Sequence, residues 1–292
     1  MSEFARYPYR AIVDHPPFRW PEEARVAVWI IPNVEYFPFA GPGAVINERT
    51  ASFRPDVVNH SWRDYGIRVG FWRLVDCLDQ ARVPVTAALN SLVCDHYPQV
   101  VEAGVRRGWE WMGHGETNSR WLVGLEAEEE AALIARVRGR IAEATGKPPS
   151  GWLSPGLSET ERTPELLRQA GVEYVADWVA DEVPFWMQTA HGPLLALPYS
   201  IEINDMELIL RQRRSGPEFR ERLIDQFEQL WRDGDRVARV MAIALHPFLI
   251  GQPHRIRYLA EVLDYLRSHN GVWFATGSEI ARYYRERFGE NL

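Results

Sequence analysis

Short apolar runs alternate along the chain with longer segments in which apolar residues recur every three or four positions. The first run, residues 24–31, is nearly all apolar, which is typical of a strand buried on both faces. The longer segments have the periodicity of amphipathic helices. We expect strands at 24–31, 83–89, 109–112, 150–156, 172–178, 194–203, 240–245 and 271–274. We expect helices at 65–80, 97–107, 126–144, 163–170, 217–232, 255–269 and 277–285.

This alternation amounts to about seven strand–helix units and predicts one α/β barrel, complete or incomplete, over residues 1–292. Residues 1–23 are rich in proline and irregular, and we expect them to form an N-terminal arm on the barrel. A doubly wound open sheet is the alternative fold. It is less favoured because no glycine-rich phosphate turn follows the first strand.

Composition narrows the classes of partner. The net charge is −7 and no basic cluster stands out, so we expect no nucleic-acid partner. Apolar runs are too short to span a bilayer, and the N-terminus has no apolar signal core. The only cysteines, Cys77 and Cys94, do not suggest a disulfide framework. These features predict a cytoplasmic protein.

Polar groups follow five of the apolar strands, where an α/β barrel carries its reactive groups. They are Glu35, His114, Asp177, Asn204-Asp205 and His246. Imidazole titrates near neutral pH, so His246 is a candidate general acid or base; a structural histidine is the alternative. His114, between two glycines, is a candidate metal ligand or carbonyl-polarising donor, or else a turn histidine. Glu35 is a candidate general base, or a solvated loop charge.

These residue types do not by themselves indicate a metal. A catalytic zinc site commonly takes three protein ligands. His114 and Glu116 lack the spacing of a His-x-x-x-His pair, and position 118 holds asparagine, a weak zinc ligand. We expect no cofactor, and one divalent ion such as zinc is the alternative, with Glu35 and His114 as its ligands.

The order of several short segments resembles the polysaccharide deacetylase superfamily, of the carbohydrate esterase family 4 type. Within it, the chain is most similar to the branch of allantoinases and cyclic imidases, from about Tyr7 to Tyr284. The segments are residues 65–73 (YGIRVGFWR), 113–115 (GHG), 151–152 (GW), 198–199 (PY), 204–206 (NDM), 245–246 (LH), 249–251 (LIG) and Arg255.

The resemblance implies a distorted (β/α)₇ barrel and a set of site positions. Glu35 falls where the family has its general base, and His246 falls where it has its general acid. His114 matches the first histidine of the family's metal motif. The other two metal positions hold Tyr36 and Asn118. The family's usual metal-dependent deacetylation is therefore not what we expect of this chain.

Three functions follow from this comparison. The first is hydrolysis of a C–N bond in a small cyclic amide, imide or ureide, with Glu35 as base, His246 as acid, and His114 and Asn118 on the carbonyl. Allantoin itself is less expected, because Glu116-Thr117-Asn118 replaces the aromatic residues that follow His-Gly in allantoinases. The second is metal-dependent deacetylation of a sugar or another acyclic amide, and the third is binding without catalysis.

The remaining predicted positions concern the substrate and the assembly. We expect substrate contacts from Asn118, Glu116, Asp177, Trp178, Tyr199 and Asn204. The resemblance also implies a homo-oligomer, with a tetramer as the expected form, which apolar residues of the arm would support.

Overall fold

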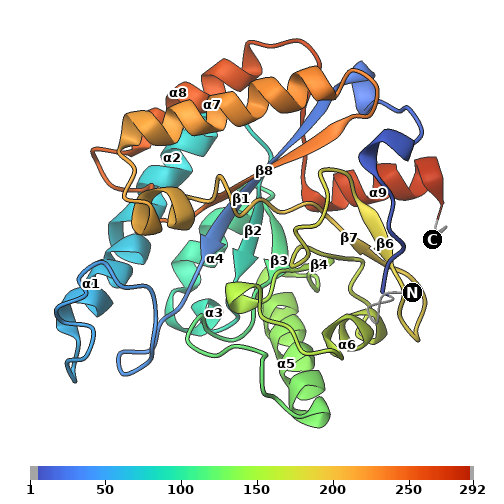
Figure 1. The fold of residues 1–292 in the computed structure, drawn as a ribbon. Helices are drawn as coiled ribbons and strands as arrows, with labels where there is room; N and C mark the ends of the chain where they lie inside the picture. The colour runs from blue at the N-terminus through green and yellow to red at the C-terminus, as the bar shows by residue number, and fades with distance from the viewer. Residues whose placement is uncertain (1–5, 290–292) are drawn as a thin grey trace.

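A curled sheet of nine strands forms the centre of the structure, a computed structural model that describes residues 6–289 (Figure 1). The strands lie in the order β6-β7-β5-β4-β3-β2-β1-β8, and β9 also pairs with β1. Every neighbouring pair is parallel except β6 with β7. The strands are β1 (Val26–Val34), β2 (Thr86–Leu89), β3 (Glu110–Gly113), β4 (Gly151–Trp152), β5 (Tyr174–Val175), β6 (Phe185–Met187), β7 (Leu194–Ala196), β8 (Arg239–Leu245) and β9 (Val272–Phe274).

Helices cover the outer face of this sheet. In Figure 1, α2, α7 and α8 lie side by side next to β1 and β8, and α5 lies beside β3. The helices are α1 (Val57–Tyr65), α2 (Phe71–Ala81), α3 (Val93–His96), α4 (Pro98–Arg106), α5 (Ala127–Thr145), α6 (Thr163–Gln169), α7 (Gly216–Asp233), α8 (Ile256–Arg267) and α9 (Gly277–Phe288). None of the helices in the described part of the chain is long and apolar enough to cross a membrane.

Besides β9, which is also parallel to β1, seven mutually parallel strands confirm the predicted (β/α)₇ barrel. They run from β7 through β5, β4, β3, β2 and β1 to β8. Near the gap between the two ends of the sheet, the Val240 N–H donates to the Glu182 carbonyl at 2.9 Å. The sheet curls instead of spreading, so the open doubly wound alternative is wrong.

Side chains alternate along β1 between two apolar cores. Val28 and Ile30 belong to the core between the sheet and the helices. Trp29 and Ile31 belong to the core inside the barrel. The interior positions of β1 are therefore the odd-numbered ones, which fixes where the residues after the strand can point.

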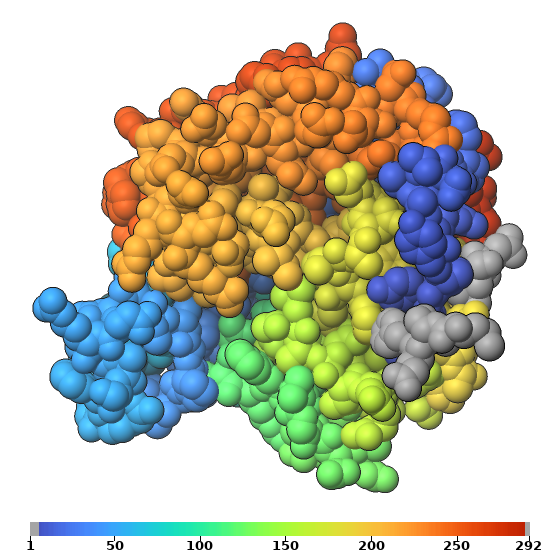
Figure 2. All heavy atoms as spheres, in the orientation of Figure 1, coloured from blue at the N-terminus to red at the C-terminus, as the bar shows by residue number. Residues whose placement is uncertain are grey.

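The structure differs from the sequence prediction in several places. The predicted strands 150–156 and 172–178 are shorter, at Gly151–Trp152 and Tyr174–Val175. The predicted strand 194–203 ends after Ala196, and a π-helical turn, Met206–Arg211, follows it. The expected long loop after β1 contains α1, which continues through the π-helical turn Gly66–Gly70 into α2. Part of that loop, between β1 and α1, stands out at one side of the molecule (Figure 2). The hairpin strand β6 was not expected.

The arm is ordered along the barrel where it is described. Phe18 forms a β-bridge with Val237. The Trp20 indole N–H donates to the Arg239 carbonyl at 2.7 Å. Residues 1–5 of the predicted arm lie outside the described residues.

Candidate active site

Three strands deliver the acid–base residues to one point inside the barrel mouth. Glu35 continues the interior series of β1, His114 follows interior Met112 on β3, and His246 follows interior Ala244 on β8. Each lies within two residues of the carboxyl end of a parallel strand, so all three meet at the same edge of the sheet. They are buried, with exposed fractions of 5%, 2% and 6%.

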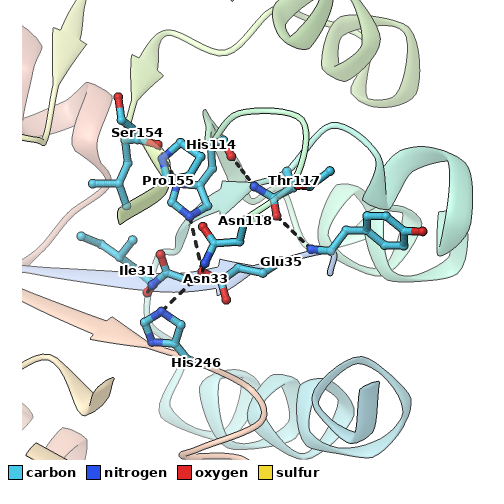
Figure 3. Close-up of polar contacts among 12 residues, drawn as sticks. Ile31, Asn33, Glu35, His114, Thr117, Asn118, Ser154, Pro155 and His246 are labelled. Atoms are coloured by element: carbon cyan, nitrogen blue, oxygen red, sulfur yellow. Dashed lines mark hydrogen bonds and ion pairs between the residues drawn. The ribbon is translucent and has the colours of Figure 1, made fainter. Parts of the chain in front are cut away.

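The Glu35 carboxylate is the centre of this cluster (Figure 3). The Asn118 side-chain amide donates to its Oε1 at 2.7 Å. His114 Nε2 lies 3.4 Å and His246 Nε2 lies 3.6 Å from the same oxygen. Among residues 6–289, nothing donates to the other oxygen, Oε2, which is buried. A buried carboxylate oxygen without a donor is costly, so this atom is suited to receive a water or a substrate N–H.

Asp205 fixes His246 on its other side. The Asp205 Oδ1 lies 2.6 Å from His246 Nδ1, and Oδ2 accepts the His246 backbone N–H at 2.7 Å. Burial opposes a charged imidazole, but Asp205 and then Glu35 outweigh it and raise the pKa of His246 to about 10. Burial also raises the pKa of Asp205. With the pKa of His246 raised to about 10, the imidazole holds the proton of this pair, and both Asp205 oxygens then accept bonds from His246.

The Glu35 side chain is ionised because the charged His246 lies beside it. Burial alone would raise its pKa, but the charge of His246 and hydrogen bonds from both histidines lower it to about 2. Glu35 and His246 thus form a carboxylate–imidazolium pair at neutral pH. One member can accept a proton and the other can donate one, as acid–base catalysis requires.

His114 is held by the backbone of β4. Its Nδ1 lies 2.6 Å from the Leu153 carbonyl oxygen, and a carbonyl only accepts, so Nδ1 carries a proton. Nε2 therefore donates only when both ring nitrogens are protonated, and accepts when the ring is neutral. Asn90, directly after β2, accepts the Tyr36 N–H at 2.9 Å and donates to the His114 carbonyl, which ties the ends of β1 and β3 together.

The residues at two of the family's three metal positions do not fit a metal. The Tyr36 ring stacks on His96, with centroids 4.2 Å apart and an interplanar angle of 4°. Asn118 uses its amide N–H on Glu35. Across residues 6–289, no three or more His, Cys, Asp or Glu side chains are grouped to hold a metal ion. The Nε2 atoms of His114 and His246 both approach the same oxygen of Glu35.

A cavity of about 190 Å³ opens over this cluster. On one wall, the Asn204 amide donates to the Tyr199 hydroxyl at 3.1 Å. Asn33, two residues before Glu35 and on the same face of β1, also lines it. Its lining residues are Asn33, Glu35, His114, Asn118, Leu153, Gly156, Leu157, Tyr199, Ile201, Asn204, Met206, Glu207, Arg211 and His246.

Three predicted substrate contacts lie away from this cavity. Glu116 pairs with Arg120 at 3.1 Å and with Arg136 at 2.9 Å near the surface. Asp177 accepts the Ser154 N–H, and the Trp178 indole donates to Glu159 at 3.1 Å. The structure thus places Glu116, Asp177 and Trp178 outside the lining of this cavity, and their substrate roles stay predictions.

Three residues of the site had no role in the sequence prediction. They are Asn33, Asn90 and Asp205. A period of two from Glu35 back along β1 would have indicated Asn33, and Asn90 directly follows the second predicted strand. Asp205 lies within the Asn204-Asp205-Met206 segment that supports the family resemblance.

Comparisons with known proteins agree with this geometry. Residues 56–175 match the polysaccharide deacetylase family model. A crystal structure from Pseudomonas aeruginosa PAO1, described as a probable polysaccharide deacetylase, has a TM-score of 0.86 and 29% identity, covering 98% of this chain and 100% of that one. The structure of PuuE allantoinase has a TM-score of 0.86 and 26% identity, covering 98% and 99%. A Schizosaccharomyces pombe protein described as "Putative polysaccharide deacetylase" is 26% identical over 90% of this chain and 91% of its own length. These similarities support a place for the chain in the polysaccharide deacetylase superfamily.

Proposed function

We propose that this protein hydrolyses a C–N bond in a small cyclic amide, imide or ureide by acid–base catalysis. One observation carries the proposal: Glu35 and His246 form a buried carboxylate–imidazolium pair, while Tyr36 and Asn118 hold the family's remaining metal positions. The similarity to PuuE allantoinase, whose name gives a cyclic ureide as substrate, supports the same class. A cavity of about 190 Å³ suits a small ring better than a polymer chain.

The steps of the reaction follow from the protonation states of the two groups, an ionised Glu35 and a protonated His246. Glu35 takes a proton from a water at its open Oε2 as the water oxygen bonds to the substrate carbonyl carbon. His246 donates its Nε2 proton to the ring nitrogen as the C–N bond breaks. The products are a carboxylic acid and an amide or amine nitrogen on one opened chain. A proton then returns from Glu35 to His246 across 3.6 Å, which restores both groups.

The two proton transfers support each other. The charge of His246 is the largest of the causes that lower the pKa of Glu35. When His246 gives its proton to the leaving nitrogen, that charge disappears and Glu35 becomes a stronger base. Water activation and leaving-group protonation are therefore favoured together and not in sequence.

The other site residues position the substrate. We assign His114 the stabilisation of the developing oxyanion, for which both ring nitrogens must be protonated. Asn118 keeps the Glu35 carboxylate oriented through its 2.7 Å bond. Loss of one donor to an oxyanion costs about 10²–10³ in kcat. Tyr199 and Asn204 supply a polar wall for the amide edge of a ring.

Metal analysis with turnover tests the proposal. Purified protein is assayed on succinimide, hydantoin and allantoin before and after chelation, alongside Glu35→Gln. Turnover of a ring that survives chelation and falls about 10²–10⁴-fold in Glu35→Gln is the expected result. Stoichiometric zinc with chelator-sensitive turnover would instead favour the metal-dependent deacetylase function. Loss of less than a few-fold in Glu35→Gln would remove the assigned base.

We also propose that the chain forms a homo-oligomer. Two apolar residues of the arm, Tyr9 and Val13, have exposed fractions of 92% and 72%. Burial of such side chains against a second copy would be favourable. Sedimentation velocity of the purified chain tests the proposal, and a single monomeric species across micromolar concentrations would reject it.

A further inference from the structure

The backbone pairing of β4 with β3 and β5 ends at Gly113 of β3, one residue before the active-site residue His114. β4 pairs with β3 and with β5 only through Gly151 and Trp152. The Leu153 N–H still donates to the Gly113 carbonyl. The next two backbone groups, the Leu153 carbonyl and the Ser154 N–H, bond to side chains and not to neighbouring strands. The Leu153 carbonyl lies 2.6 Å from His114 Nδ1. The Ser154 N–H donates to Asp177 Oδ1 at 2.7 Å.

These two bonds belong to a single peptide group. The carbonyl of Leu153 and the N–H of Ser154 are its two ends, and they point to opposite sides of β4. A carboxylate that accepts the N–H draws positive charge to that end and leaves the carbonyl oxygen more negative. Hydrogen bonds in such chains strengthen one another by about 10–30% each. Asp177 therefore acts on His114 without touching it.

A second carboxyl group holds Asp177 in this arrangement. Glu159 faces Asp177, and one oxygen of each, Glu159 Oε2 and Asp177 Oδ2, is buried without a donor among residues 6–289. One proton shared between these two oxygens satisfies both. Burial and the facing Asp177 raise the pKa of Glu159 to about 10, so Glu159 carries that proton at neutral pH. Asp177 then keeps the charge that faces Ser154.

We infer that Asp177 is a positioning residue that acts on His114 through the Leu153–Ser154 peptide, with Glu159 as its proton-sharing partner. Its effect is to keep the proton of His114 on Nδ1 and the ring fixed against β4. The consequence for catalysis rests on the proposed function, in which His114 stabilises the oxyanion. The effect on the His114 ring itself does not depend on that function.

Two substitutions interrupt this series of hydrogen bonds at different points. Asp177→Asn removes the charge but keeps an oxygen for Ser154 and gains an amide for Glu159. Ser154→Pro replaces the peptide N–H by a ring carbon, which displaces Asp177 Oδ1 from its position 2.7 Å from the nitrogen, while the φ of −68° is compatible with proline. Ser154→Ala is the matched control, because it keeps the N–H and loses only the hydroxyl that accepts the Trp152 indole N–H at 3.0 Å.

Two readouts follow the effect. The ¹³C shift of His114 Cδ2, assigned by comparison with His114→Gln, reports which ring nitrogen is protonated. We expect Asp177→Asn and Ser154→Pro to move this shift in the same direction and to lower kcat about tenfold with little change in KM. Ser154→Ala should leave both as in the parent. The double variant Asp177→Asn/Ser154→Pro should have a kcat no lower than that of Ser154→Pro alone, since both substitutions act on the same series of hydrogen bonds.

The outcomes separate this inference from the proposed function. An unchanged Cδ2 shift in Asp177→Asn overturns the inference, whatever the activity. Equal losses in Ser154→Ala and Ser154→Pro also overturn it, because the packing of Ser154 and not its N–H would then matter. If the parent turns over no ring but the Cδ2 shift still moves, the proposed function fails while the link from Asp177 to His114 stands.

Discussion

The substitution Asp205→Asn tests how His246 is kept charged. Asp205 accepts two bonds from His246, one from ring Nδ1 and one from the backbone N–H. Asparagine has one oxygen, and the backbone N–H can only donate, so that oxygen stays with the backbone. The asparagine amide then faces Nδ1 and requires a lone pair there. His246 becomes a neutral ring with its proton on Nε2, a much weaker acid.

The magnitude follows from the pKa. Raising the pKa of His246 from 6.5 to about 10 corresponds to about 5 kcal/mol of preference for the charged ring. Asp205 is the largest of the causes that raise it, and burial opposes it. Without the Asp205 charge, and with the asparagine amide facing Nδ1, we expect the pKa of His246 to fall well below 10, while Glu35 still raises it. Loss of a positioned general acid at pH 8 should then lower kcat/KM by about 10²–10⁴-fold.

The pH profile of kcat/KM is the assay. In the parent, the basic limb should lie near pH 10, because the free enzyme loses the acid as His246 deprotonates. In Asp205→Asn it should move well below pH 10. Glu202→Gln is the matched control, since it removes an exposed carboxylate three residues away and should leave the limb in place.

Stability gives an independent check. A raised pKa stabilises the fold below the unfolded value of 6.5, and this stabilisation is lost as the pH rises towards 10. The free energy of unfolding of the parent should fall over that window by up to about 5 kcal/mol, and that of Asp205→Asn should fall by less. A basic limb that stays near pH 10 in Asp205→Asn would refute the reasoning.

Further predictions concern stability. The lowered pKa of Glu35 stabilises the fold above pH 4.5. The free energy of unfolding in urea should therefore fall by up to about 3 kcal/mol as the pH falls towards 2, and Glu35→Gln should not show this fall. Glu110 accepts four bonds at the base of the barrel, so Glu110→Gln should cost about 1–3 kcal/mol in urea unfolding with kcat unchanged; an equal loss of kcat would contradict this. A Cβ on Gly70 would lie 2.1 Å from the Pro247 carbonyl oxygen, so Gly70→Ala should lower both Tm and kcat. Gly139→Ala, on an open helix face, should instead raise the free energy of unfolding by about 0.5–1 kcal/mol.

The hydrophobic pattern predicted the barrel and the strand ends because both depend on local periodicity. Buried parallel strands have apolar runs that are visible in the sequence, and His114 and His246 directly follow two of them. The same pattern contains more than the prediction used. Interior positions recur every two residues, so Asn33 shares the interior face of Glu35, whereas Asp177 has the parity of Val175, which faces the helices.

Asp205 could not be placed by periodicity. It lies in irregular chain after β7, just before the π-helical turn at residues 206–211, where no repeat fixes the direction of a side chain. It reaches His246 through a contact between residues 41 positions apart. The position of Asn204-Asp205 after a predicted strand and the resemblance of the Asn204-Asp205-Met206 segment marked this region. Its role as the partner of His246 required the fold.

Charge balance explains how this site can differ from the metal-dependent pattern and keep its base. A buried carboxylate needs a compensating charge or donors. At Glu35 these come from the imidazolium of His246 and the amide of Asn118, bound to a single oxygen. The two titrating groups therefore behave as a pair, and their pKa values belong to the pair. Glu35→Gln must also lower the pKa of His246, and loss of the His246 charge must raise the pKa of Glu35, so removing both should cost much less than the sum of the two single losses.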